Sequence, residues 1–315
     1  MELRNLGSSG LRVSAVGLGC NNFGVRIDLA ASRAVVDAAI EAGITLLDTA
    51  DMYGGKGGSE TALGEILGSR RKDIVLATKF GMQMDDAGVK IGASRRYIMQ
   101  AVEDSLRRLK TDWIDLYQLH KPDPRTPIEE TLRALEDLIR DGKVRYIGCS
   151  NLPAWQVVEA HWTAANVGAF PFVSCQDEYS LVVRGVEKEL IPAACHYGMG
   201  LLPFFPLASG LLTGKYRRGE SLPEGARITK EQRHADRYLT DRNWAIVEGL
   251  RQFAEERGHT LLDMAFGWLL SRPYVGSVIA GATRPEQVAQ NVEATGWDLT
   301  AEDMAAIDKI CGTGA

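Results

Sequence analysis

Cysteine is scarce in this chain, and its cysteines lie far apart in the sequence. There are five in 315 residues, and they are Cys20, Cys149, Cys175, Cys195 and Cys311. No two of them form a C-x-x-C pair, so their spacing indicates neither a disulfide framework nor a zinc site. We expect these thiols to fill space in the hydrophobic core, as free cysteines commonly do.

An excess of positive charge and long apolar segments are also missing. The formal net charge is −5, with acidic and basic side chains interspersed, so no basic stripe for nucleic acid and no membrane-binding patch is indicated. No apolar run approaches the ~18 residues of a membrane-spanning helix, and residues 1–5 lack the features of a signal peptide. We expect a cytoplasmic protein whose partner is a small molecule, and the sequence leaves its oligomeric state open.

The glycine-rich turn that opens a doubly wound dinucleotide-binding sheet is absent as well. The only candidate contains Gly17 and Gly19, but Asn22 stands where the third glycine belongs and no helix follows directly. An open doubly wound sheet would also suit alternating strands and helices, although it more often uses about five to seven strands. The sequence therefore disfavours that fold.

Short apolar segments alternate with amphipathic helices along nearly the whole chain. The predicted strands are residues 16–19, 44–47, 73–78, 113–119, 144–149, 172–176, 199–204 and 275–280. The helices predicted between and after them are residues 32–41, 59–67, 94–109, 127–140, 153–165, 186–197 and 285–293. Eight such units with continuously apolar strands predict a single α/β domain over residues 1–315, a closed (β/α)₈ barrel of the TIM type.

Several additions to this barrel are predicted. A Gly/Ser turn within residues 1–17 indicates an N-terminal β-hairpin. The seventh strand is followed by a long loop over residues 205–240, which is typical of a lid or binding loop. Extra helices are predicted at 244–257 and 261–270, and a C-terminal helix at 300–310. At the start of the helix at 127–140, Thr126 and Glu129 have the spacing of a capping box.

Three consecutive predicted strands end in side chains that can handle protons. Asp48 and Tyr53 follow the second strand, Lys79 ends the third, and His120 ends the fourth. Because the carboxyl ends of barrel strands meet at one mouth, we expect these four side chains to be neighbours.

The four residue types together suit general acid catalysis. A tyrosine with a pKa near ~10 is a poor acid at neutral pH, but a buried lysine beside it would lower that pKa while a carboxylate keeps the lysine charged. Tyr53 would then protonate an alkoxide, and His120 would orient a carbonyl oxygen. The alternative is a structural ion pair with aromatic neighbours, since buried ion pairs also perturb pKa values.

The motifs around these residues resemble those of the aldo-keto reductase superfamily, over nearly the whole chain. They are Asp48-Thr49-Ala50-Asp51-Met52-Tyr53-Gly54, Gly58-Ser59-Glu60-Thr61-Ala62-Leu63-Gly64, Ala77-Thr78-Lys79 and Asp115-Leu116-Tyr117-Gln118-Leu119-His120. The resemblance implies a nicotinamide-dependent carbonyl reductase in which Asp48, Tyr53, Lys79 and His120 are the catalytic tetrad and Tyr53 is the proton donor.

The same resemblance implies where a cofactor binds. Ser150, Asn151 and Gln176 match the residues that hold the nicotinamide carboxamide, and Phe204 matches the aromatic ring that stacks on the nicotinamide. Phe205 stands where many members carry serine. The segment that cradles the pyrophosphate is matched by Pro206, Leu207, Ser209, Gly210 and Lys215.

A predicted helix that begins near Pro285 is a candidate phosphate site. Its free N–H groups and the adjacent Arg284 form a ready anion site, or else an ordinary capped helix with a solvated arginine. The resemblance favours adenosine 2′-phosphate, and therefore NADP rather than NAD. The residues implied there are Gly281, Thr283 and Arg284, with Gln287 and Asn291 facing the adenine and with help from Lys215 and Arg227.

Two other functions remain open at this stage. A cofactor-binding regulatory subunit is possible, because the superfamily includes a channel-associated branch that binds NADP and turns over slowly. A metal-dependent hydrolase on the same barrel would need clustered ligands at strand ends. The remaining histidines lie instead in predicted helices or in the insertion, so we expect no metal; they are His161, His196, His234 and His259.

Overall fold

The chain begins with a β-hairpin that covers one end of a barrel. The computed structural model describes residues 1–223 and 226–312. Strands β1 (Leu3–Asn5) and β2 (Arg12–Ser14) pair antiparallel. The apolar side chains of the hairpin, among them Leu6 and Val13, pack against side chains inside the barrel, such as Leu46 and Leu116. The predicted hairpin is therefore confirmed, and it seals the amino-terminal end of the barrel.

Eight parallel strands form the barrel in the order β10-β3-β4-β5-β6-β7-β8-β9. Their bounds are β3 Val16–Gly19, β4 Leu46–Asp48, β5 Val75–Phe80, β6 Ile114–Leu119, β7 Val144–Ser150, β8 Ser174–Glu178, β9 Gly200–Phe204 and β10 Val278–Gly281. The ring closes where Leu201 forms a parallel bridge with Val275 and its N–H donates to Tyr274 O at 2.8 Å. The predicted (β/α)₈ barrel is confirmed.

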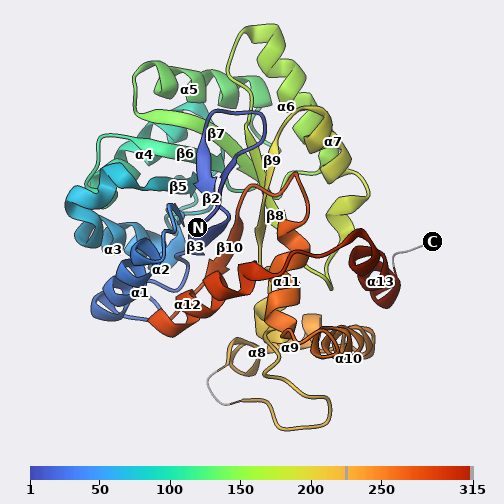
Figure 1. Ribbon diagram of the computed structural model, residues 1–315. Helices are drawn as coiled ribbons and strands as arrows, with labels where there is room; N and C mark the ends of the chain where they lie inside the picture. The colour runs from blue at the N-terminus through green and yellow to red at the C-terminus, as the bar shows by residue number, and fades with distance from the viewer. Residues whose placement is uncertain (224–225, 313–315) are drawn as a thin grey trace.

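Helices surround the strands on the outside (Figure 1). The helices that alternate with the strands are α1 Leu29–Glu41, α3 Gly58–Leu67, α4 Arg95–Leu109, α5 Ile128–Arg140, α6 Ala154–Val167, α7 Leu190–His196 and α12 Pro285–Glu293. Each buries an apolar face against the sheet. In α5, for example, Leu132, Leu135 and Leu138 are fully buried.

The capping box predicted for α5 is wrong. Pro127 occupies the N-cap position and makes no side-chain cap. The Thr126 hydroxyl donates instead to Asp123 at 2.8 Å, and Glu129 pairs with Arg133 one turn along the helix. The loop before α5 is thus held by Asp123, which accepts the hydrogen bond of the Thr126 hydroxyl that a capping box would otherwise use.

The segment after β9 differs from the predicted long loop. It contains the 3₁₀ turn η3 (Ala208–Thr213) and the short helices α8 (Arg227–Lys230) and α9 (Gln232–Tyr238). Helices of four and seven residues show too few apolar repeats to be recognised by periodicity. With α10 (Asp241–Glu255) they lie together at the bottom of Figure 1.

The other predicted helices are present. They are α11 (Leu261–Leu270) and α13 (Ala301–Cys311), and α13 begins with a capping box between Thr300 and Asp303. Within the described residues, no helix has the length and apolarity needed to cross a membrane.

Candidate active site

Asp48 and Lys79 form an ion pair at the carboxyl-terminal mouth of the barrel. Asp48 is the last residue of β4 and Lys79 lies near the end of β5. The Lys79 ammonium donates to Asp48 Oδ2 at 2.7 Å and to Thr49 O at 2.9 Å. Both side chains are buried. Burial alone would lower the pKa of Lys79, but the neighbouring Asp48 and Tyr53 raise it, so the lysine is held as a cation.

The second oxygen of the Asp48 carboxylate is held by two amides. Gln176 Nε2 donates to Asp48 Oδ1 at 2.9 Å, and Gln118 Nε2 donates to the same oxygen at 3.3 Å. Gln118 was not singled out from the sequence. It lies on β6, two residues before His120, which directly follows that strand. The period of two along a strand places both side chains on the inner face. This spacing is the signal in the sequence that would have identified Gln118.

A glycine turn delivers Tyr53 to this mouth. Tyr53 opens the short helix α2 (Tyr53–Lys56), in which Gly54 and Gly55 have φ angles of 73° and 75°. A Cβ on Gly54 would lie 2.3 Å from the amide nitrogen of Ser59, so only glycine fits there. The Ser59 hydroxyl donates to Cys20 O at 2.8 Å and ties the start of α3 to the end of the β3 strand region.

Tyr53 lies between Lys79 and His120. The Lys79 ammonium is 5.1 Å from the centroid of the Tyr53 ring, and the rings of Tyr53 and His120 meet edge to face at 5.6 Å. The four predicted residues are therefore neighbours, as expected. Burial raises the pKa of Tyr53, and the Lys79 charge opposes that rise without reversing it. The expected net lowering of the tyrosine pKa is therefore wrong, because burial outweighs the charge of the single nearby cation.

His120 is held as a neutral imidazole. Burial, followed by the positive charges of Lys79 and Lys121, lowers its pKa to about 3. The backbone N–H of His120 donates to Phe80 O at 2.9 Å, which fixes the backbone at this position. The ring atom Nδ1 is buried and has no hydrogen-bond partner among the described residues. A neutral imidazole carries one N–H, so His120 can donate one hydrogen bond to a ligand oxygen.

The next strand ends carry the residues expected to hold a carboxamide. Ser150 Oγ donates to Gln176 O at 2.7 Å, and Asn151 Nδ2 donates to His120 O at 3.0 Å. The amide nitrogens of Asn151 and Gln176 are thus used within the protein, while no described residue donates to their amide oxygens. Two such acceptors suit the NH₂ group of a carboxamide.

The chain after β9 adopts left-handed conformations. Phe205, Ala208 and Ser209 have φ angles of 49°, 45° and 57°, and Gly210 has 100°. Non-glycine residues at such angles cost energy and cluster at functional sites. The N–H groups of Ala208 and Gly210 donate within the turn, to Phe205 O at 2.9 Å and Leu207 O at 2.8 Å. Pro206 is buried and Leu207 half-buried in the same run, next to the half-buried Phe204. The resemblance implies that a pyrophosphate binds against this run, and this stays a prediction.

Two cations lie near this run. A Cβ on Gly210 would come within 3.3 Å of the Lys215 ammonium, so the lysine crosses the glycine closely. Burial and the charge of Arg284 both lower the pKa of Lys215. The two positive charges therefore influence each other. Neither forms an ion pair with a described residue, so together they offer positive charge to an anion.

Arg227 contacts the loop after β3. Its guanidinium sits 5.5 Å from the centroid of the Phe205 ring and donates to Asn22 Oδ1 at 2.9 Å. It therefore joins α8 to the loop after β3 and covers Phe205.

The start of α12 is organised by Gln287. Gln287 Oε1 accepts from the N–H of Thr283 at 2.8 Å and from its hydroxyl at 3.1 Å. The amide oxygen of Gln287 is thus used to hold the loop before α12. The sequence did not predict this contact. Asn291 is buried on the same helix, and Gly281 and Arg284 are exposed.

Asp177 is a buried carboxyl group that the sequence did not single out. It follows Gln176 on β8, so its side chain points away from the barrel interior. It is 7% exposed, and its Oδ2 atom has no partner among the described residues. Burial raises its pKa to about 8, so this carboxyl is largely protonated at neutral pH.

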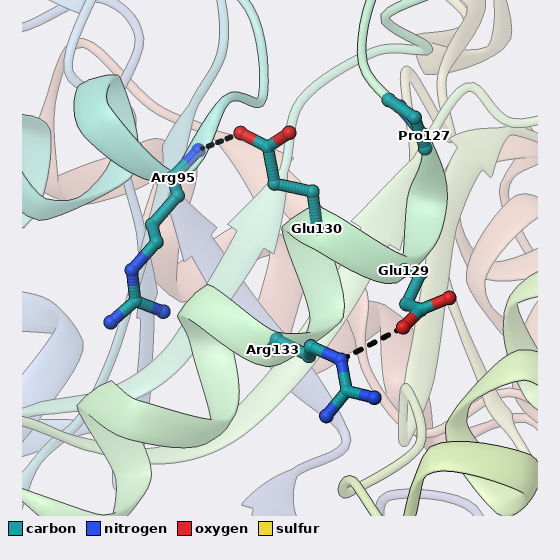
Figure 2. A pocket seen from close by; sticks show the side chains of 5 residues that line it. All are labelled: Arg95, Pro127, Glu129, Glu130 and Arg133. Carbon is teal, nitrogen blue, oxygen red and sulfur yellow. Dashed lines mark hydrogen bonds and ion pairs between the residues drawn. The ribbon is translucent and has the colours of Figure 1, made fainter.

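A depression of about 340 Å³ lies outside the barrel, between α4 and α5. Figure 2 shows the contacts of its polar groups: the backbone N–H of Arg95 donates to Glu130 at 2.9 Å, and Arg133 Nε donates to Glu129 at 2.9 Å. The Arg95 guanidinium pairs with Asp137. Each of these side chains is thus engaged by a neighbour on α4 or α5, and none of the four catalytic candidates lines the depression.

No group of three or more His, Cys, Asp or Glu side chains within residues 1–223 and 226–312 is placed to hold a metal ion. The metal-dependent hydrolase considered from the fold alone therefore has no ligand set in the described part of the chain.

Comparisons with known proteins show the family of this chain. The family model described as the aldo/keto reductase family matches residues 15–311. A probable voltage-gated potassium channel subunit beta of Oryza sativa subsp. japonica is 40% identical over 308 residues, which cover 93% of this chain and 91% of that protein. An uncharacterized oxidoreductase, YrpG, of Bacillus subtilis is 36% identical over 320 residues, covering 98% and 96%. An L-glyceraldehyde 3-phosphate reductase of Escherichia coli O157:H7 is 34% identical over 326 residues, covering 100% and 93%. The chain belongs to the aldo/keto reductase family.

Proposed function

We propose that the protein is an NADP(H)-dependent oxidoreductase that reduces an aldehyde, a ketone or a sugar carbonyl to an alcohol, with Tyr53 as the proton donor. The observation that carries the proposal is the buried Lys79 ammonium, which lies 2.7 Å from Asp48 and 5.1 Å from the centroid of the Tyr53 ring. Membership of a reductase family supports an oxidoreductase, and the relatives named as a reductase and an oxidoreductase support carbonyl reduction.

The side chains divide the proton chemistry among them. Tyr53 gives its phenolic proton to the carbonyl oxygen as that oxygen becomes an alkoxide. Lys79 stabilises the phenolate that remains, and Asp48 keeps the lysine charged in its buried position. The neutral ring of His120 donates its N–H to the same carbonyl oxygen and orients it. When bound, NADPH supplies the hydride that balances the proton. The reverse oxidation of an alcohol uses the same groups in the opposite direction.

The residues present suit NADP. Asn151 and Gln176 offer amide oxygens to the nicotinamide carboxamide, and the left-handed run that ends at Gly210 suits the pyrophosphate. Lys215 and Arg284 carry positive charges that no described carboxylate neutralises, and these suit the additional phosphate that distinguishes NADP from NAD.

A survey of turnover tests the proposal. Purified protein is mixed with NADPH or NADH and a panel of aldehydes, ketones and sugars, and nicotinamide oxidation is followed; alcohols with NADP⁺ test the reverse direction. We expect reduction with NADPH and slower reduction with NADH. Failure to bind either nicotinamide would sink the proposal.

A second candidate is an NADP-binding auxiliary subunit with little turnover. It is favoured by one observation, the 40% identity to a protein named as a probable potassium channel subunit beta. The same survey separates the two functions, because tight NADPH binding without turnover on any carbonyl would favour the auxiliary role.

A further inference from the structure

A second depression, of about 220 Å³, lies at the rim of the barrel mouth. Its walls come from the loops after β5 and β6 and include Gly81, Gly92, Lys121, Asp123 and Arg125. Gly81 stands two residues after Lys79, and Lys121 directly follows His120. The depression therefore begins at the same strand ends that carry two of the four catalytic candidates.

The charges in this depression do not cancel. Asp123 accepts from the N–H of Ala93 and from the Thr126 hydroxyl, both at 2.8 Å, and from Arg125 Nε at 3.3 Å. The Arg125 charge is thus matched by Asp123. The Lys121 ammonium forms no ion pair with any residue in the described part of the chain, so the depression keeps one unmatched positive charge.

The wall of this depression is held in place by a contact between its two loops. Gly92 has a φ of 89°, and a Cβ there would lie 2.3 Å from Asp123 Oδ2. Glycine at this position therefore allows Asp123 to reach the Ala93 N–H and hold the two loops together. Pro122 and Pro124 flank Asp123 and restrict the backbone on the Lys121 side.

We propose that this depression, with Lys121 as its cation, binds an anionic group of the carbonyl substrate, so that the preferred substrates carry a carboxylate or a phosphate a few bonds from the carbonyl. The inference rests on the proposed function and deepens it. Lys121 directly follows His120, and both residues leave β6 at the mouth of the barrel, where the depression also includes Gly81, two residues after Lys79. A substrate whose carbonyl oxygen contacts His120 would need only a short chain between its carbonyl and an anion paired with Lys121.

Matched substrates test this directly. Succinic semialdehyde is compared with butanal for the carboxylate, and glyceraldehyde 3-phosphate with glyceraldehyde for the phosphate. For each pair the ratio of kcat/KM, anionic over neutral, is measured in wild type and in Lys121→Gln. We expect the ratio to fall by about tenfold, or about 1.4 kcal/mol, in at least one pair, and the pair that responds identifies the anion.

A control variant accounts for the change in net charge. Lys72 is exposed in the turn η1 (Gly68–Asp73), which precedes β5 at the opposite end of the barrel. Lys72→Gln should leave both ratios unchanged. Equal ratios in wild type and Lys121→Gln for both pairs, with neutral aldehydes still reduced, would overturn the subsite and leave the proposed function intact.

A binding measurement does not depend on turnover. Isothermal titration of the protein with succinate at saturating NADP⁺ should give weaker binding for Lys121→Gln than for wild type and Lys72→Gln. The same affinity in all three proteins would also overturn the subsite, whereas weaker binding without any turnover would support it and count against the reductase.

Discussion

The Lys79 ammonium and the Asp48 carboxylate face each other at 2.7 Å, with both side chains buried at the mouth of the barrel. Removing one partner leaves the other as an uncompensated buried charge, which typically costs about 3–5 kcal/mol. We therefore expect Asp48→Asn to lower the free energy of unfolding by roughly that amount and to reduce activity as well. Urea denaturation and NADPH-dependent aldehyde reduction measure the two effects.

The double variant Asp48→Asn/Lys79→Met separates stability from catalysis. It removes both charges, so much of the lost stability should return. Activity should stay low, because no cation remains beside Tyr53. Recovery of activity together with stability would show that the pair acts only in folding.

His120 should remain neutral throughout the physiological range. Its pKa is lowered to about 3, first by burial and then by the charges of Lys79 and Lys121. Because the folded pKa lies below the ordinary value near ~6.5, the stabilising contribution of His120 is complete above that value and is lost as the pH falls toward the folded pKa. Long-range ¹H–¹⁵N NMR of the ring should show one unchanged neutral tautomer from about pH 5 to pH 8. A protonation step of His120 within that range would contradict this description.

Arg284 should set the preference for NADPH over NADH. The lowered pKa of Lys215 reflects burial and then the Arg284 charge, and under the proposed function both cations would act on the same phosphate. In Arg284→Gln we expect the Kd for NADPH to rise about tenfold relative to that for NADH, with a weaker dependence on salt. Arg12→Gln, on the hairpin at the other end of the barrel, is the matched control. A ratio that does not change in Arg284→Gln would remove Arg284 from the phosphate site.

Asp177 should make the protein less stable in alkaline solution. Its folded pKa is raised to about 8 by burial, whereas an unfolded aspartate titrates near ~3.9. Its stabilising contribution is complete below the unfolded value and is lost as the pH rises through the folded value. Asp177→Asn should match wild type at about pH 5 and be more stable by a few kcal/mol at about pH 9. Urea midpoints at both values measure this, and a difference that does not vary with pH would contradict it.

The barrel was predictable because each of its units has a recognisable pattern in a short stretch of sequence, and this pattern repeats along the chain. Each strand is a short apolar run and each helix buries a regular face, so every unit points to the same architecture. The positions of Asp48, Tyr53, Lys79 and His120 followed from that architecture, since strand ends meet at one mouth. The reaction and the cofactor came from the resemblance to a family.

What the sequence did not predict depends on contacts between distant segments. The net rise of the Tyr53 pKa is decided by how completely the tyrosine is buried, which no local pattern records. Gln118 contributes through one hydrogen bond to Asp48, seventy residues away along the chain. The loop before α5 shows the same limit, because Asp123 provides the contacts that a capping box with Thr126 was expected to make.

The measurement that tests the account most directly is single-turnover reduction by Tyr53→Phe. Wild type and variant are loaded with NADPH and mixed rapidly with an aldehyde, and the loss of nicotinamide absorbance is followed. The account predicts that the rate of this step falls by about 10²–10⁴ while the Kd for NADPH is unchanged. Reduction by Tyr53→Phe at the wild-type rate would contradict the assignment of Tyr53 as the proton donor.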